Sequence, residues 1–244
     1  MINISKSNFK SPLGKILRFP LKLIPETTVL PILQGPLKGK SWIKGSATNG
    51  CWLGTYELDK QFLFSQFVKP GMIIYDVGAN VGFYTLLASI LTGSNGKVFS
   101  FEPLPENISF LKNHLELNKL SNINVIVKAA SNKVSTVKFN LGENRSSGHI
   151  SEKGEIKVET ISIDEFIKQG NPSPNLIKFD IEGAEYEELI GAKELLKNKK
   201  PVIFLATHSK ELRAKCLKLL TEFGYSVSTI DNKPLDESDD FVCE

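Results

Sequence analysis

The stretch from Met72 to Ala88 constrains the fold of this chain more than any other. A short apolar run ends at Asp76, two glycines follow four residues apart, and an apolar segment with helical spacing begins after them. This order is typical of a buried strand, a tight glycine turn and a helix. Glycines suit such a turn because the backbone must adopt torsions that a side chain disfavours.

The glycine turn indicates the kind of ligand that the chain binds. In the dinucleotide fingerprint G-x-G-x-x-G, the middle glycine lets the backbone touch a pyrophosphate. Asn80 occupies that middle position here. The turn therefore favours a ligand without phosphates, and S-adenosylmethionine (SAM) fits, with its nucleoside, cationic sulfonium and amino-acid end. An NAD-type ligand is the alternative.

The length and composition are those of one large α/β domain. The chain has 244 residues, of which 41% are hydrophobic and 23% charged, as in ordinary globular proteins. Its three cysteines, Cys51, Cys216 and Cys243, are odd in number, far apart and without metal-ligand spacing. They predict free thiols in a reducing compartment, with no disulfide framework and no metal site.

The formal net charge of +3 is unevenly distributed along the chain. Residues 1–44 carry eight Lys or Arg against one acid, Glu26, which gives +7, so the rest carries −4. Such a basic arm can contact an anionic glycan, a lipid headgroup or nucleic acid. The simpler interpretation is a solvated extension packed against the core.

The N-terminal region does not read as a targeting or membrane-spanning segment. Met1 to Pro20 is interrupted by Lys, Arg and Pro before a long apolar core forms, and no later run approaches the length of a transmembrane helix. We therefore expect a soluble, cytoplasmic protein. Peripheral membrane contact through Leu13 to Leu33 stays open, although Pro12 precedes that stretch and three further prolines interrupt it.

Strand and helix patterns alternate from Met72 onward, which predicts a doubly wound α/β fold with a mostly parallel, seven-stranded sheet. We expect an inserted hairpin from residues 134–141 and 155–161, and one helix over residues 184–198. The last two strands can pair antiparallel because their connection is too short for a crossover helix. Residues 1–56 are predicted to form the basic arm and a small lid, and residues 57–244 the SAM-binding domain.

Ligands of open α/β sheets bind outside the carboxyl ends of the strands. Glu102 ends the second strand, 26 residues after Asp76, where a carboxylate can accept both ribose hydroxyls of a nucleoside. Asn80 and the backbone of residues 78–82 would hold the amino-acid end, with Asp76 helping directly or by fixing the turn. The predicted cofactor-binding residues are Asp76, Gly78, Ala79, Asn80, Gly82, Phe83, Glu102, Pro103 and Ala130.

Three residues are candidates for catalysis. Asp180 and Glu182 follow the fourth strand two positions apart, and two nearby carboxylates can leave one able to take a proton near neutral pH. The alternative is that Asp180 orders the loop and Glu182 caps the next helix. His208 follows the fifth strand and is a second candidate base.

Two further histidines receive weaker interpretations. His114 falls within a surface-helix pattern and is interpreted as solvated. His149 lies in a polar loop with Arg145, Ser146 and Ser147, and this group could line a mobile substrate flap.

Four segments together resemble the FkbM family of SAM-dependent methyltransferases: residues 75–85, 101–103, 159–166 and 177–185. The similarity covers residues from about 54 to 210, including Gly54-Thr55-Tyr56-Glu57. It implies a class I, Rossmann-like fold, SAM as methyl donor, and O-methylation of sugars or natural-product hydroxyls. One departure concerns His208: family members often carry an acid two residues earlier, where this chain has Ala206.

Carried over by position, Asp76, Gly78, Asn80, Gly82 and Glu102 match the family's cofactor motifs, and Asp180, Glu182 and Gly183 match its second signature. We therefore expect SAM as cofactor and a small-molecule or glycan hydroxyl as acceptor. RNA ribose O-methylation stays open because of the basic arm, although we otherwise expect no nucleic-acid partner. A non-catalytic SAM-binding protein and an NAD-dependent oxidoreductase are the remaining alternatives.

Overall fold

The computed structural model describes residues 21, 23–141, 148–150, 154, 156–181 and 183–244. Glu182, Arg145, Ser146 and Ser147 lie outside the described residues, as does most of the basic arm. The same holds for the side chain of His149. The predictions for these residues therefore stay predictions.

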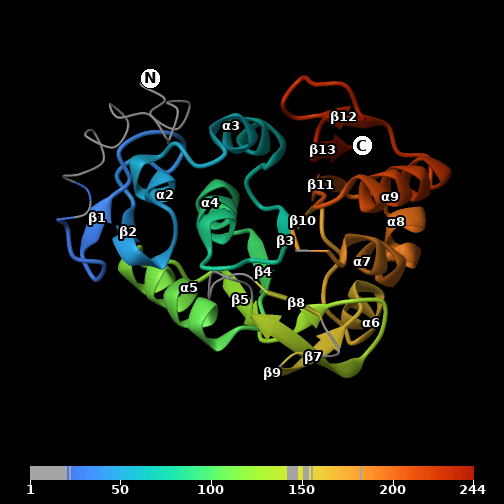
Figure 1. The fold of residues 1–244 in the computed structure, drawn as a ribbon, viewed down its shortest axis with the longest axis horizontal. Coiled ribbons are helices and arrows are strands. Elements are labelled where there is room, and N and C mark those ends of the chain that lie inside the picture. The colour runs from blue at the N-terminus through green and yellow to red at the C-terminus, as the bar shows by residue number, and fades with distance from the viewer. Residues whose placement is uncertain (1–20, 22, 142–147, 151–153, 155, 182) are drawn as a thin grey trace.

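A seven-stranded sheet forms the centre of the molecule (Figure 1), as predicted. Its strand order is β12-β13-β11-β10-β3-β4-β5. The strands are β3 (Ile73–Val77), β4 (Lys97–Phe101), β5 (Ile123–Ile126), β10 (Leu176–Phe179), β11 (Val202–Ala206), β12 (Val227–Thr229) and β13 (Asp240–Cys243). Neighbouring strands are parallel from β11 to β5, whereas β13 runs antiparallel to both β11 and β12.

Helices cover both faces of this sheet (Figure 1). On one face lie α3 (Leu58–Phe67), α4 (Phe83–Thr92) and α5 (Pro105–Leu117); on the other lie α6 (Ile163–Lys168), α7 (Glu185–Gly191), α8 (Lys193–Asn198) and α9 (Lys210–Glu222). Alternate residues of β3 serve the two cores, since Ile74 packs with the first group of helices while Tyr75 and Val77 pack with the second. Among the described residues, no helix has the length and apolar character to cross a membrane.

The helices begin where local chemistry favours it. Pro105 occupies the start of α5, where a missing N–H costs nothing. The Ser162 hydroxyl accepts a hydrogen bond from the Glu165 amide at the start of α6, and the Ser209 hydroxyl does the same for Leu212 at α9, at 3.2 Å in both cases.

The strand order reverses between β3 and β10, which makes their carboxyl ends the place for a ligand crevice. Val77 pairs with Phe179 of β10 on one side and with Phe101 of β4 on the other. The residues that follow these three strands therefore lie next to one another at one edge of the sheet.

The described part of the N-terminal segment packs against this domain. It contains β1 (Val29–Pro31), β2 (Ser41–Ile43), a short 3-10 turn η2 (Lys44–Ser46) and α2 (Asn49–Leu53), with β1 and β2 paired antiparallel. Trp42 is fully buried, and its ring stacks on His114 of α5 with 3.8 Å between centroids. Lys44 of the predicted basic arm is also buried, and its ammonium lies 2.5 Å from Glu26.

Two regions differ in detail from the predicted elements. The expected hairpin strands, β7 (Ser135–Leu141) and β9 (Ile156–Ile161), do pair antiparallel, but β6 (Ala129–Ala130) and β8 (Gly148–Ile150) extend them to a separate four-stranded sheet. The single helix expected over residues 184–198 is broken at Ala192 into α7 and α8. Gly191 packs so closely on the residue after β6 that a Cβ would lie 2.1 Å from the Ser131 carbonyl oxygen.

The interpretation of His114 as solvated was wrong, because the imidazole is fully buried under Trp42. Its Nδ1 lies 2.8 Å from the Val81 carbonyl oxygen, and its Nε2 accepts a hydrogen bond from the Ile43 amide at 3.2 Å. A carbonyl only accepts, so Nδ1 carries the proton and the ring is neutral. Burial lowers the pKa of His114 to about 4.

Buried His114 predicts a loss of stability in mild acid. The unfolded chain takes up this proton near pH 6.5 and the folded chain only near pH 4, so acid favours unfolding. Between pH 7 and pH 5, the free energy of unfolding of the wild type should fall by about 2 kcal/mol more than that of His114→Gln. Urea titrations of both proteins at the two pH values measure this difference, and equal losses would contradict it.

Candidate active site

A cavity of about 400 Å³ lies at the carboxyl ends of the central strands. Its walls come from four parts of the chain: the N-terminal segment, the ends of β3 and β4, strands β6 and β7 of the second sheet, and the ends of β10 and β11. The lining residues with chemical interest are Thr48, Cys51, Tyr56, Glu57, Gly78, Asn80, Tyr84, Glu102, Lys178, Asp180 and His208. The predicted residues Ala79, Phe83, Pro103 and Ala130 also line it.

The glycine turn after β3 lets two strand ends approach closely. Gly78 has φ +77°, and a Cβ there would lie 2.1 Å from the backbone oxygen of Asp180. Gly82 has φ +92°, and its Cβ would lie 2.9 Å from the Leu111 side chain. Any side chain at these two positions would push β10 or α5 away from the turn. Gly82 is not among the residues that line the cavity, and it packs against α5 instead.

Asn80 closes the turn against a pyrophosphate. The side-chain Oδ1 of Asn80 accepts a hydrogen bond from the backbone amide of Val81 at 2.7 Å. The backbone amide of Asn80 donates to the Glu102 carboxylate at 2.8 Å. Amides at this position grip the pyrophosphate in dinucleotide-binding folds. Here protein groups already occupy them, and the Glu102 carboxylate would repel a phosphate.

Asp76 lies beneath the turn rather than in the cavity. It is 1% exposed, and its Oδ2 accepts a hydrogen bond from the Thr85 hydroxyl at 2.6 Å. Burial raises the pKa of this carboxyl, while Lys178 and Thr85 oppose the rise. Of the two roles considered for Asp76, fixing the turn agrees with this position and direct contact with a ligand does not.

Glu102 is held rigidly at the wall of the cavity. Besides the Asn80 amide, its carboxylate accepts hydrogen bonds from the Leu104 amide at 2.9 Å and the Asn107 side chain at 3.1 Å. Burial raises its pKa, although these three donors favour the ionised form. A carboxylate has about four lone-pair sites, so it can also accept from a ligand hydroxyl.

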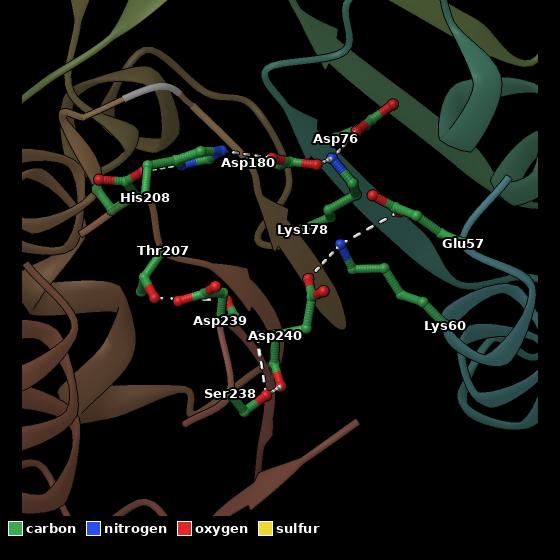
Figure 2. Close-up of polar contacts among 11 residues, drawn as sticks. Glu57, Lys60, Asp76, Lys178, Asp180, Thr207, His208, Ser238, Asp239 and Asp240 are labelled. Atoms are coloured by element: carbon green, nitrogen blue, oxygen red, sulfur yellow. Dashed lines mark hydrogen bonds and ion pairs between the residues drawn. The ribbon is translucent and has the colours of Figure 1, made fainter. Parts of the chain in front are cut away.

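Lys178 is a site residue that the sequence analysis missed. It is 3% exposed, and its ammonium lies 2.9 Å from Asp180 and 3.8 Å from Asp76. Figure 2 shows His208, Asp180, Lys178 and Asp76 in a row. A lysine inside the otherwise apolar strand β10 was the signal that could have identified it.

The charge of Asp180 is set by its cationic neighbours. Burial alone would raise the pKa of Asp180, but the ammonium groups of Lys178 and Lys60 outweigh that effect and hold it well below its usual range. We had expected one carboxylate after β10 to take a proton near neutral pH. Asp180 does not fit that expectation, because it stays ionised.

His208 has an acidic partner that comes from another element. Its Nδ1 lies 2.5 Å from Oε1 of Glu185, a fully buried residue at the start of α7, and its Nε2 lies 3.8 Å from Asp180. The sequence analysis noted that Ala206 stands where related chains carry an acid. Here Glu185 supplies an acidic partner, so the departure at Ala206 does not leave His208 without one.

The N-terminal segment contributes a cysteine to the cavity wall, which the sequence analysis also missed. Burial raises the pKa of Cys51 to about 12. The thiol is therefore neutral at physiological pH and is a poor nucleophile.

Comparison with known proteins decides the family. The Methyltransferase FkbM domain matches residues 76–227, more than half of the chain. The chain belongs to the FkbM methyltransferase family. It is accordingly a SAM-dependent methyltransferase with the class I fold, as its sequence motifs implied.

Two curated relatives and one solved structure of another protein show what this FkbM methyltransferase is similar to. Hexuronic acid methyltransferase AglP of Haloferax volcanii is 29% identical over 173 residues, which are 70% of this chain and 69% of AglP. Protein-L-isoaspartate O-methyltransferase of Methanococcoides burtonii is 34% identical over 59 residues, covering 24% of this chain and 29% of that protein. The crystal structure of methyltransferase FkbM from Methylobacillus flagellatus has a TM-score of 0.55 at 19% identity, over 81% of this chain. The matched part is 55% of that structure, so this chain spans about half its length.

The cavity fits SAM in its chemistry. It presents a carboxylate, Glu102, that suits ribose hydroxyls, and a turn whose first amides are closed to phosphate. Several carboxylates near the cavity suit a ligand that carries positive charge.

Gly78 should be far more sensitive to substitution than another glycine of the same backbone conformation. Gly71 has φ +82° but nothing within 4 Å of its Cβ position, so Gly71→Ala should cost about 1 kcal/mol. Gly78→Ala adds a clash with backbone and should cost roughly 3 kcal/mol or more. Thermal or urea unfolding of the two variants tests this, and similar losses would mean that the close approach to Asp180 is unimportant.

Proposed function

We propose that this FkbM methyltransferase transfers the methyl group of SAM to a hydroxyl of a sugar or glycan. The observation that carries the proposal is the pair of His208 and Glu185 at the cavity, which can take a proton from a hydroxyl. The relative named a hexuronic acid methyltransferase supports a sugar as the acceptor.

The two ends of the cavity suit different ligands. We assign the ribose hydroxyls of SAM to Glu102 and place its amino-acid end beside the turn from Gly78 to Asn80. When bound, SAM supplies a methyl group on a positively charged sulfur, which is open to in-line displacement by an oxygen. Three strand spacings, roughly 14 Å, separate the end of β4 from the end of β11. Glu102 and His208 therefore lie at opposite sides of the site, which leaves the side of His208 for the acceptor.

His208 is the general base in this proposal. Its Nδ1–H donates to Glu185, so Nε2 keeps its lone pair and can accept the proton of the acceptor hydroxyl as the oxygen takes the methyl group. Buried Glu185 fixes the ring orientation and stabilises the imidazolium that forms. Asp180, ionised and 3.8 Å from Nε2, stabilises the same positive charge. A catalytic role for Glu182 stays a prediction.

The division of the chain into a lid and a SAM-binding domain also stays a prediction. What supports it is that Ala47, Thr48 and Cys51 line the cavity from the N-terminal segment. In the proposal, this segment forms one wall of the site and excludes water from it.

The acceptor class can be tested with labelled methyl groups. Incubation with methyl-labelled SAM and separate pools of neutral sugars, hexuronic acids, lipids and RNA should label a sugar pool. A methyl ether on a hydroxyl survives mild alkali, whereas a methyl ester on a hexuronic acid carboxylate is released as methanol, so the label should be alkali-stable. Labelling of RNA alone, or an alkali-labile label, would refute sugar O-methylation. Binding of SAM without any transfer would favour a non-catalytic role.

Removal of the base should slow turnover without weakening cofactor binding. His208→Gln should lower kcat by roughly 10²- to 10⁴-fold, and Glu185→Gln should lower kcat by a smaller factor with little change in KM. Calorimetry with S-adenosylhomocysteine, the demethylated product, should give wild-type affinity for both variants. Glu187→Gln, an exposed acid on the same helix α7, is the matched control and should keep full activity. Unchanged kcat in His208→Gln would exclude this base.

A further inference from the structure

Glu57 has a backbone conformation that its position in the chain does not require. Its φ of 43° and ψ of 45° lie in the left-handed region, which non-glycine residues seldom adopt. It directly precedes α3, yet its side chain makes no capping hydrogen bond to that helix. Strained residues of this kind cluster at functional sites, where the surrounding structure holds them in place.

The Glu57 side chain faces the cavity and shares its cationic partner. It is 27% exposed and lines the cavity, and its Oε2 lies 3.2 Å from the ammonium of Lys60. That ammonium lies closer still, at 2.5 Å, to Asp240. Figure 2 shows Lys60 between these two carboxylates. Lys60 therefore compensates the charge of Glu57 only in part.

The polar cluster around this point has an excess of negative charge. Four carboxylates, those of Glu57, Asp76, Asp180 and Asp240, surround the two ammonium groups of Lys60 and Lys178. Even with a proton on Asp76, one negative charge is left over. Unbalanced charge is costly away from bulk water, so the cluster is complementary to a positively charged ligand group.

The phenols near Glu57 do not change this balance. Burial and the negative charge of Glu57 raise the pKa of both Tyr56 and Tyr84, so the two rings stay neutral. Both rings line the cavity together with Glu57. The carboxylate thus sits in a pocket wall of aromatic rings, where it is partly shielded from solvent.

The other carboxylates are committed elsewhere. Asp76 lies beneath the turn and does not reach the cavity. Asp180 is bonded to Lys178 at 2.9 Å, and Glu102 faces the ribose side with three protein donors. We infer that Glu57 binds the ammonium group at the amino-acid end of SAM. This inference rests on the SAM dependence of the family and not on the acceptor proposed above.

A thermodynamic cycle between protein and ligand tests the inference by binding alone. The ligands are S-adenosylhomocysteine and the adenosyl thioether of 4-mercaptobutanoate, which differs only in lacking the amine. Loss of the amine should weaken binding to the wild type roughly 10- to 100-fold. The same loss should weaken binding to Glu57→Gln by less than about threefold. Isothermal titration calorimetry provides all four dissociation constants.

A control variant is available in helix α3, which begins directly after Glu57. Asp59→Asn removes an exposed acid from the first turn of α3 and should behave as the wild type with both ligands. The inference would be overturned if removal of the amine weakened binding to Glu57→Gln as much as to the wild type. It would also be overturned if Asp180→Asn, and not Glu57→Gln, became insensitive to the amine. Equal affinities of the two ligands for the wild type would overturn it without any variant. Neither ligand donates a methyl group, so failure of sugar methylation is a separate result.

Discussion

The buried ammonium of Lys178 joins the two strand ends on which the site depends. It lies within 3.8 Å of the carboxylates of Asp76 in β3 and Asp180 directly after β10, the strands at which the sheet order reverses. Gly78 lets the same two strand ends approach until no side chain fits between them. Removing the ammonium would leave buried Asp76 without a nearby cation and Asp180 with Lys60 as its main cation, which is more costly than the pair itself is stabilising. The cation therefore stabilises the close approach of the two strands that form the floor of the cavity.

The same cation divides the chemical roles within the site. Because Lys178 and Lys60 keep Asp180 ionised, Asp180 is a poor proton acceptor and a good electrostatic partner. In our proposal, proton transfer therefore belongs to His208, whose ring is held by the carboxylate of Glu185. Asp180, one of the two carboxylates predicted from the sequence as a candidate base, thus differs from that prediction because it lies 2.9 Å from a lysine.

Local patterns were enough to predict the sheet and the glycine turn. The strands are short apolar runs, and their ends carry the polar residues that line the cavity, so Gly78, Asn80, Glu102 and Asp180 could be identified from order along the chain. Contacts between distant segments could not be predicted this way. His114 looked solvated on its own helix, because the residue that covers it, Trp42, lies 72 positions earlier. Glu185 could be paired with His208 only once the direction of α7 was known.

Methyl transfer from a sulfonium to a hydroxyl leaves the total charge of the site unchanged. The positive charge that the donor loses reappears on the residue that takes the hydroxyl proton, which is His208 in our proposal. A site for this reaction needs negative charge that cannot be neutralised by that proton. Asp180 meets the requirement, since it lies 3.8 Å from Nε2 while Lys178 holds its pKa too low for protonation. The lysine thus stabilises the charged product state indirectly, by keeping the neighbouring carboxylate ionised throughout the reaction.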